Sequence, residues 1–346
     1  MDKKLKFGLV GLGGIGHGHA DSLLQCEYAD FIAVCDPKGR DAIRPDTKVV
    51  LPDSITFYTD FDEFIEKSGV EAIIISAPDV VHCEYTVKAL ERGIHVMCEK
   101  PLAITDDEAR QMAQAAKKST ARAFVGQICR FTPAFVKARE LIDEGVLGDV
   151  FCIESQYRHN CHENLPETDW RKVDPRHATA CGGCHAIDIV RYFVDEAPEE
   201  VFAFGNQFCR KDWVVEDASE TVMKFPSGAI ARVFTSLGSI SPYSMHTEIY
   251  GTKASVITDN TWTKVELHTR EMGENGYYEY KVEEIPVAVN NHNCVDQVIE
   301  MCRAILFGDK ARHEIVEGAK SLYVCNGAIR SMASGEKVVL DYSDLY

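Results

Sequence analysis

Short apolar runs alternate with amphipathic stretches of helical periodicity over the first 125 residues. The pattern predicts strands over residues 7–10, 31–35, 72–76, 94–98 and 123–125, and helices over residues 17–26, 61–67, 81–92 and 106–119. Such alternation is typical of an α/β fold with a doubly wound parallel sheet. In sheets of this kind, functional groups gather beyond the carboxyl ends of the strands.

The pattern changes near residue 150. Strands are predicted over residues 150–157, 220–225, 229–235, 246–251 and 337–340, and helices over residues 291–306 and 316–334. Turn signals such as Pro226-Ser227-Gly228 separate the strands. We therefore expect two domains, residues 1–125 and 126–346, with the last helices packing back across the junction.

Composition narrows the function further. The 346 residues are enough for two domains. The net charge of −17 argues against binding to nucleic acid or to anionic membranes, because such binding needs clustered Lys and Arg side chains. No apolar run reaches the length of a membrane span, and the one near the N-terminus is too short for a signal peptide. The thirteen cysteines show no disulfide framework and are interpreted as reduced thiols. We expect a cytoplasmic protein.

A glycine-rich motif follows the first predicted strand and opens the first predicted helix. It consists of Gly11, Leu12, Gly13, Gly14, Ile15 and Gly16. Strand, Gly-x-Gly-x-x-Gly and helix together are the context in which this motif binds a dinucleotide. Its first glycine permits a tight turn, the second lets the backbone approach the pyrophosphate, and the last lets helix and strand pack closely. The unpaired N–H groups of the helix start would bind the anion.

An acidic residue at the end of the second predicted strand bears on the choice of cofactor. Asp36 follows Gly16 by 20 residues, so its carboxylate could accept hydrogen bonds from the ribose hydroxyls and repel a 2′-phosphate. A simple turn and a solvated aspartate are the alternatives for each feature alone, but spacing and flanking elements agree. We predict a Rossmann domain that binds NAD, while Lys38 and Arg40 leave room for NADP.

A further ordered set of residues points to one family. It comprises Ala77-Pro78, His82 and the segment Gly93-Ile94-His95-Val96-Met97-Cys98-Glu99-Lys100-Pro101. The set resembles the Gfo/Idh/MocA family of glucose–fructose oxidoreductase and inositol dehydrogenase, whose hallmark is a Glu-Lys-Pro tripeptide after a strand. The resemblance implies a C-terminal α+β domain with an open, mostly antiparallel sheet that binds substrate and forms a homo-oligomer, dimer or tetramer. The resemblance also implies that five more residues bind the cofactor: Ala77, Pro78, His82, Glu99 and Lys100.

Lys100 is the residue of this set best suited to chemistry. The resemblance implies that it lies beside the nicotinamide ring. There its amine could donate to the reacting carbonyl oxygen or stabilise the alkoxide during hydride transfer. The alternative is a surface lysine paired with Glu99.

His185 and Asp188 fall one turn apart on the same face of a predicted helix. In the resembled family a His-x-x-Asp on this helix supplies the acid/base histidine and its carboxylate partner. Such a base is needed because removing a hydride from an alcohol also requires removing a proton. Asp188 would then fix the tautomer of the His185 imidazole. The alternative is a capping histidine beside a salt-bridged aspartate.

Substrate contacts are expected from Tyr157, His162, Trp170, Arg171 and His185. Trp170 could form an apolar wall against a sugar, and Arg171 could bind hydroxyls or a carboxylate. Many relatives carry an aspartate four residues before the catalytic histidine, where this chain has Cys181, a poor substitute for a carboxylate. His162 or His177 could take that role.

The run Cys181-Gly182-Gly183-Cys184-His185 also matches two other patterns. Cys-x-x-Cys-His attaches covalent haem, but that requires an exported protein without a competing dinucleotide domain. The cysteines and a histidine could bind zinc, but one Cys-x-x-Cys is half a site, and a zinc-bound His185 could not act as a base. We favour an interpretation of this run without a metal, in which the two glycines allow a close approach to the ligand and the two cysteines fill small spaces.

These features predict an NAD-dependent oxidoreductase that transfers a hydride between the nicotinamide and a hydroxyl carbon of a sugar, cyclitol or glycoside. His185 would be the acid/base and Lys100 would stabilise the oxyanion. Two alternatives stay open: glycoside cleavage through transient sugar oxidation with recycled NAD, and a non-catalytic NAD or sugar sensor on the same scaffold. The expected partner is a small polyol or sugar, not nucleic acid or membrane.

Overall fold

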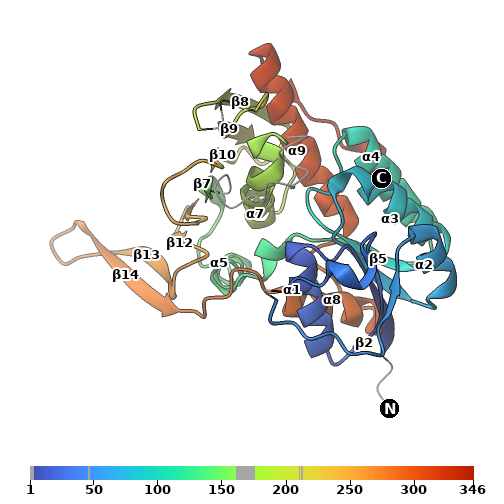
Figure 1. Cartoon of the computed structure of the whole chain (residues 1–346). Helices are drawn as coiled ribbons and strands as arrows, with labels where there is room; N and C mark the ends of the chain where they lie inside the picture. The colour runs from blue at the N-terminus through green and yellow to red at the C-terminus, as the bar shows by residue number, and fades with distance from the viewer. Residues whose placement is uncertain (1–3, 46, 161–175, 210, 212) are drawn as a thin grey trace. The chain divides into compact units, whose positions relative to one another are not determined.

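The computed structural model describes residues 4–45, 47–160, 176–209, 211 and 213–346. The chain forms two compact units (Figure 1). The first comprises Met1–Ile128, Asn293–Leu322 and Ser343–Tyr346, and the second comprises Cys129–His292 and Tyr323–Tyr342. Across the described ranges, none of the helices has both the length and the hydropathy needed to cross a membrane.

In the described residues of the first unit, six parallel strands form one sheet in the order β3-β2-β1-β4-β5-β6. The strands are β1 (Leu5–Val10), β2 (Ala29–Cys35), β3 (Thr56–Tyr58), β4 (Ala72–Ile75), β5 (His95–Cys98) and β6 (Ala123–Val125). The chain changes its direction of progress between β1 and β4. In doubly wound sheets this switch point is where ligands bind. The predicted Rossmann sheet is therefore confirmed.

Helices pack on this sheet, four of them between its strands and one from much later in the chain. They are α1 (Gly14–Gln25), α2 (Phe61–Lys67), α3 (His82–Glu91), α4 (Asp106–Lys118) and α8 (Cys294–Phe307). Helix α4 begins with a capping box, in which Thr105 and Glu108 each accept a hydrogen bond from the other's backbone N–H. Helix α8 packs beside α1 (Figure 1) and adds Val298 and Met301 to the apolar core.

The sheet of the second unit is mixed and, over the residues described, has the order β14-β13-β12-β11-β7-β10-β9-β8-β15. Its strands are β7 (Val150–Arg158), β8 (Glu200–Asn206), β9 (Ala218–Lys224), β10 (Ile230–Ser236), β11 (Thr247–Gly251), β12 (Ser255–Thr258), β13 (Lys264–Met272), β14 (Tyr278–Pro286) and β15 (Val338–Val339). Neighbouring strands are antiparallel except β7 and β10, which are parallel. The mostly antiparallel sheet is confirmed.

Helices cover one face of this sheet. Helix α5 (Pro133–Asp143) packs on β12 and β13, and α7 (Cys184–Val194) packs on β7 and β10. A π-helical turn, Thr179–Gly183, leads directly into α7. Helix α9 (Ile315–Ser334) begins in the first unit and ends in the second.

The other face of the sheet carries side chains that remain accessible in the single chain. Alternate residues point to it, and large exposed apolar ones among them are Phe204, Val222, Ile230, Tyr280 and Val282. Ion pairs lie between them, for example Arg232 with Glu154 and Glu220. The β13–β14 hairpin extends as a two-stranded ribbon at one end of the sheet (Figure 1, orange).

Candidate functional site

The glycine-rich motif lies at the end of β1 and the start of α1, as predicted. Gly11 has a φ of +87°, and a Cβ there would lie 2.7 Å from the backbone nitrogen of Ala77. A Cβ on Gly16 would overlap the carbonyl oxygen of Gly11. Nothing lies within 4 Å of a Cβ placed on Gly13. Two glycines thus permit close packing, while the third leaves its backbone open, and this arrangement fits a bound pyrophosphate.

Asp36 holds the loop after β2 against the glycine-rich motif. Its Oδ2 accepts a hydrogen bond of 2.9 Å from the backbone nitrogen of Leu12, and its Oδ1 accepts one of 2.9 Å from that of Lys38. Each carboxylate oxygen has further acceptor capacity, so Asp36 can make these bonds and still accept from ribose hydroxyls. Arg40, by contrast, donates to the carbonyl of Ile55 and lies 4.8 Å above the Phe57 ring.

His82 joins the loops that follow β4 and β5. The side chain is buried, with Nε2 2.9 Å from the carbonyl oxygen of Ala77. Nδ1 lies 3.0 Å from the carbonyl oxygen of Pro101 and 3.3 Å from that of Leu102. The residue expected to bind cofactor thus directs both ring nitrogens at the protein backbone.

Glu99 is fixed immediately before Lys100. Its Oε1 lies 2.8 Å from His19 Nε2, and its Oε2 accepts a hydrogen bond of 3.0 Å from the backbone nitrogen of Lys100. Burial opposes ionisation of Glu99, but the hydrogen bond and charge of His19 outweigh it, so the pKa of this carboxyl lies below its usual value. Gly126 packs against it, and a Cβ there would lie 2.8 Å from the carboxylate. The side chain of Lys100 itself is half-buried.

In the second unit, His185 lies in the first turn of α7 and is buried. Its ring stacks on Tyr157, with centroids 5.8 Å apart and planes at 20°, and its Nδ1 lies 3.4 Å from Cys129 Sγ. The two predicted residues Tyr157 and His185 are therefore neighbours. The sulfur of Cys129 is a contact that no motif in the sequence indicated.

Further aromatic and imidazole rings surround this stack. The Tyr157 hydroxyl lies 3.1 Å from His159 Nδ1, and the Tyr243 ring packs 4.8 Å from the His159 ring. His292 stacks on Tyr243 at 6.3 Å. We call Tyr157, His159, His185, Tyr243 and His292 the aromatic–imidazole cluster. Burial raises the pKa of the Tyr243 phenol well above its usual value, so this hydroxyl stays protonated.

Asp188 lies on α7 one turn after His185 and is tied to Arg130. Its two carboxylate oxygens accept hydrogen bonds of 2.7 Å from Nε and Nη2 of Arg130. Arg191 Nη1 lies 3.8 Å from Asp188 Oδ1, and all three side chains are buried. The carboxylate that we expected to orient the imidazole thus joins α7 to the segment that carries Cys129 and Arg130.

The paired glycines before α7 pack against strands. A Cβ on Gly182 would overlap the Tyr157 ring, and one on Gly183 would lie 2.5 Å from Thr235 Oγ1. Their absent side chains therefore let the π-helical turn approach β7 and β10, a different role from the approach to ligand suggested by the sequence. Cys184 is buried, with its Sγ 3.8 Å from the carbonyl oxygen of Cys181.

His162, Trp170 and Arg171 lie outside the described residues. His177 pairs with Glu216, which also accepts from the Thr179 hydroxyl at 3.2 Å. In the part of the chain that the structure describes, no group of three or more His, Cys, Asp or Glu side chains is arranged to bind a metal ion.

Two family models match the chain. The one described as the oxidoreductase family with an NAD-binding Rossmann fold covers residues 5–127, and the one for the GFO/IDH/MocA C-terminal domain covers residues 135–257. Together they span more than half of the sequence. The chain belongs to the GFO/IDH/MocA oxidoreductase family. The prediction from the glycine-rich motif and the Glu-Lys-Pro tripeptide is confirmed, and the chain is an oxidoreductase with an NAD-binding domain.

Individual relatives match this chain over most of their own length. The myo-inositol 2-dehydrogenase of Thermotoga maritima is 27% identical over 79% of this chain and 80% of its own. The 2,7-anhydro-N-acetylneuraminate hydratase of Escherichia coli is 26% identical over 99% of this chain and 90% of its own. A levoglucosan dehydrogenase structure with NADH has a TM-score of 0.86 at 19% identity, over 98% of this chain and 100% of its own. That likeness shows the fold of this oxidoreductase.

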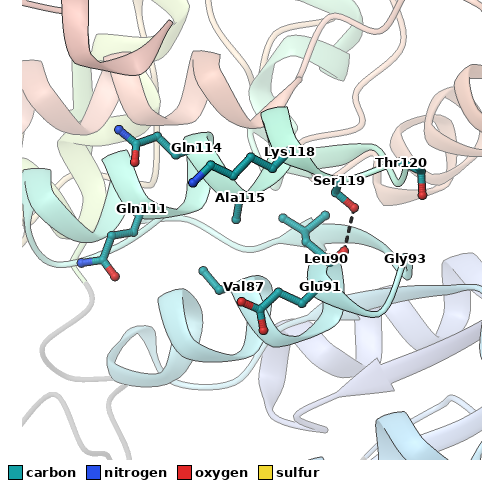
Figure 2. A pocket seen from close by; sticks show the side chains of 10 residues that line it. All are labelled: Val87, Leu90, Glu91, Gly93, Gln111, Gln114, Ala115, Lys118, Ser119 and Thr120. Carbon is teal, nitrogen blue, oxygen red and sulfur yellow. Dashed lines mark hydrogen bonds between the residues drawn. The ribbon is translucent and has the colours of Figure 1, made fainter.

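A surface groove of about 550 Å³ in the first unit of the oxidoreductase lies away from these residues. Val87, Leu90 and Glu91 of α3 face Gln111, Ala115 and Lys118 of α4 across it (Figure 2). The Ser119 hydroxyl closes one end by donating to the carbonyl of Leu90 at 2.7 Å. Because the groove lies between helices and not at the carboxyl ends of the strands, we do not assign it to the redox site.

Proposed function

We propose that this oxidoreductase transfers a hydride between NAD and a hydroxyl carbon of a sugar, cyclitol or glycoside. The observation that carries the proposal is the fixed Lys100 on the NAD-binding sheet. It follows β5, and Glu99 binds its backbone nitrogen at 3.0 Å. NAD, when bound, supplies the acceptor of the hydride. The residues proposed to hold it are the glycine-rich motif with Ile15, Asp36, Ala77 and Pro78.

The proposed roles of Lys100 and His185 are complementary. The Lys100 ammonium donates a hydrogen bond to the substrate oxygen and stabilises the negative charge that develops there. The His185 imidazole takes the hydroxyl proton. Because its Nδ1 faces Cys129 Sγ at 3.4 Å, Nε2 is the nitrogen to which we assign this proton. Asp188 acts as a positioning residue, since its ion pair with Arg130 fixes the helix that carries His185.

The aromatic–imidazole cluster supports a polyol as the substrate. Tyr157 and Tyr243 combine flat apolar rings with hydroxyl groups, which suits the mixed apolar and polar faces of a sugar ring. His159, paired with the Tyr157 hydroxyl, adds a polar group beside them. His162, Trp170 and Arg171 remain in the proposed substrate set on sequence grounds alone. The name of the Thermotoga maritima relative, a myo-inositol 2-dehydrogenase, supports the same substrate class.

A second candidate is a reaction without net oxidation. The Escherichia coli relative that spans 99% of this chain is named a 2,7-anhydro-N-acetylneuraminate hydratase. Hydration adds water and leaves the overall oxidation state unchanged. On this chain, such a reaction or a glycoside cleavage would use transient oxidation of the sugar by NAD that is regenerated within each turnover.

Product analysis and NADH absorbance distinguish these candidates. The protein is incubated with NAD and panels of cyclitols, sugars, anhydro sugars and glycosides. Net dehydrogenation produces NADH in proportion to product, whereas the second candidate changes the sugar while NADH stays constant. In either case Lys100→Met and His185→Gln should each lower kcat/KM at least about 100-fold, the usual scale for a lost acid/base or oxyanion contact, without weakening NAD binding. Binding of NAD and sugar without formation of any product would indicate a sensor and would refute the enzyme proposal.

We also propose a homo-oligomer, dimer or tetramer, formed through the open face of the second sheet. Phe204, Val222 and Ile230 are 69%, 47% and 50% exposed on this face in the single chain. Interspersed ion pairs such as Arg232–Glu154 would give polar contacts between the apolar ones. Exposed apolar side chains gathered on one sheet face are typical of a surface that a partner covers.

A further inference from the structure

We infer that His82 is a positioning residue whose doubly protonated ring clamps the loop of Lys100 to the loop of Ala77. This inference rests on the function proposed for Lys100. It assigns His82 to the protein's own backbone, where the sequence suggested a contact with the cofactor. The group clamped is the segment Lys100-Pro101-Leu102.

The chemistry of the contacts requires two N–H donors. Both ring nitrogens face carbonyl oxygens, Nε2 that of Ala77 at 2.9 Å and Nδ1 that of Pro101 at 3.0 Å. Carbonyl oxygens only accept hydrogen bonds, and a neutral imidazole carries one donor and one acceptor. Only the imidazolium can therefore donate to both carbonyl oxygens; in a neutral ring one nitrogen would instead accept from the Cys98 thiol, which also hydrogen-bonds to the ring. Because the side chain is 1% exposed, water cannot replace either contact.

The surroundings of His82 compensate its charge. The ring lies against Cys98 of β5, and Asp79, in the 3-10 turn Asp79–Val81 before α3, is the nearby carboxylate. The start of α3 disfavours a cation, since the N-terminal end of a helix dipole is positive. Burial also works against the charge, but Cys98, the carbonyl of Ala77 and Asp79 outweigh it and raise the pKa of His82 to about 9. A charged ring at neutral pH agrees with the hydrogen-bond geometry.

The clamp acts on one side of Lys100, and a second buried histidine acts on the other. Glu99, which precedes Lys100, pairs with His19 at 2.8 Å, while Pro101, which follows it, accepts from His82 at 3.0 Å. The backbone of Lys100 is thus held at both neighbours by imidazole rings from α1 and α3. Positioning of this kind matters because a shift of about 1 Å in a reacting group can cost about 100-fold in rate.

The test uses nitrogen-15 NMR of the full-length protein labelled at histidine, with His82 assigned by its loss in His82→Asn. We expect both His82 nitrogens to have imidazolium shifts at pH 7 and to titrate near pH 9. His95 is the control in the same spectrum, because its Nδ1 accepts from the backbone nitrogen of Arg122 at 2.9 Å and so must be unprotonated. A neutral His82 at pH 7 would overturn the inference, whatever the enzyme's activity.

A second measurement tests the effect on Lys100. In protein labelled with carbon-13 at the lysine ε position, the Lys100 signal, assigned with Lys100→Met, should shift in His82→Asn. Where a substrate has been found, His82→Asn should lower kcat about 10- to 100-fold and change the NAD dissociation constant less than about threefold, as expected for misplacement of a catalytic group. An unchanged Lys100 signal would overturn the positioning role. Absence of any turnover by the wild type would instead refute the proposed function and leave both NMR tests decisive.

If His82→Asn fails to fold, Cys98→Ala keeps the inference testable. The thiol of Cys98 is one of the groups that raise the pKa of His82, so its removal should move the His82 titration to lower pH. The wild-type spectrum then still decides the charge, because comparison with Cys98→Ala assigns the His82 signals. Identical titration of every histidine signal in the wild type and Cys98→Ala would contradict the charge environment described here.

Discussion

The Asp188 carboxylate accepts two hydrogen bonds of 2.7 Å from the Arg130 guanidinium, and both residues are buried. Removing one partner of a buried pair leaves an uncompensated charge and costs about 3–5 kcal/mol. Arg191 lies 3.8 Å from the same carboxylate, which makes the two single variants unequal. Asp188→Leu removes the carboxylate from two guanidinium groups, whereas Arg130→Met leaves Asp188 beside Arg191.

We therefore predict that Asp188→Leu lowers the free energy of unfolding by about 3–5 kcal/mol and Arg130→Met by less. Urea unfolding followed by circular dichroism measures both. The double variant should recover part of the loss, because only Arg191 then remains without its carboxylate. Equal losses in the two single variants would show that Arg191 does not interact with Asp188.

Gly13 and Gly16 are predicted to respond differently to the same small change. A Cβ on Gly13 meets nothing within 4 Å, so the free energy of unfolding of Gly13→Ala should lie within about 1 kcal/mol of that of the wild type. The variant should nevertheless bind NAD more weakly, because its methyl group occupies the space beside the backbone that the pyrophosphate approaches. A Cβ on Gly16 would overlap Gly11, so Gly16→Ala should lose about 1–3 kcal/mol of stability. Calorimetric titration with NAD and urea unfolding measure the two effects. Unchanged NAD affinity in Gly13→Ala would contradict the assigned groove.

The Glu99–His19 pair predicts a particular loss of stability in acid. The pKa of Glu99 is lowered from its ordinary value of 4.5, so its contribution is complete above pH 4.5. Below pH 4.5 the unfolded chain binds a proton that the folded protein does not, and the contribution disappears as the pH falls through the lowered pKa. Glu99→Gln should remove this part of the acid dependence. Urea unfolding from pH 6 to pH 3 tests this, with the exposed Glu91→Gln as the control; parallel curves for wild type and Glu99→Gln would contradict it.

If the proposed oligomer forms through the open face of the second sheet, charged side chains introduced on that face should dissociate it. Val222→Glu and Ile230→Glu should each sediment as a smaller species than the wild type, because a carboxylate placed in the interface loses its hydration on association. Val50→Glu, at a position 84% exposed in the first unit, is the matched control and should not change the mass. Analytical ultracentrifugation measures all four proteins. A monomeric wild type at micromolar concentration would refute the proposal.

The sequence predicted the first unit well because apolar runs and caps coincide with its elements. Helix α2 has its predicted bounds, with Asp60 capping it by accepting from the backbone nitrogen of Glu63. Strand β3 was missed because its three residues are exposed or half-buried, whereas β6, equally short, is a fully buried apolar run. In the second unit β14 was missed because most of its side chains are exposed on both faces, which leaves no alternation of apolar and polar positions.

In the site, likewise, residues that stand in local motifs were predicted, whereas contacts between residues far apart in the sequence were not. Gly11, Asp36, Lys100 and His185 stand in motifs whose spacing is readable along the chain. The contact of Cys129 with His185 joins residues 56 positions apart, and that of Arg130 with Asp188 joins residues 58 apart. Such contacts arise when separate elements pack in the folded chain, so no local pattern in the sequence records them.

Gly126 and Glu99 constrain each other across the ends of two strands. A Cβ at position 126 would enter the space of the Glu99 carboxylate, so a larger residue there requires a smaller or retracted one at position 99. Homologous sequences should therefore vary at these two sites in a correlated way. A protein that acquires a side chain after its sixth strand is expected to have lost the acidic member of its tripeptide, and with it the partner of the histidine on its first helix.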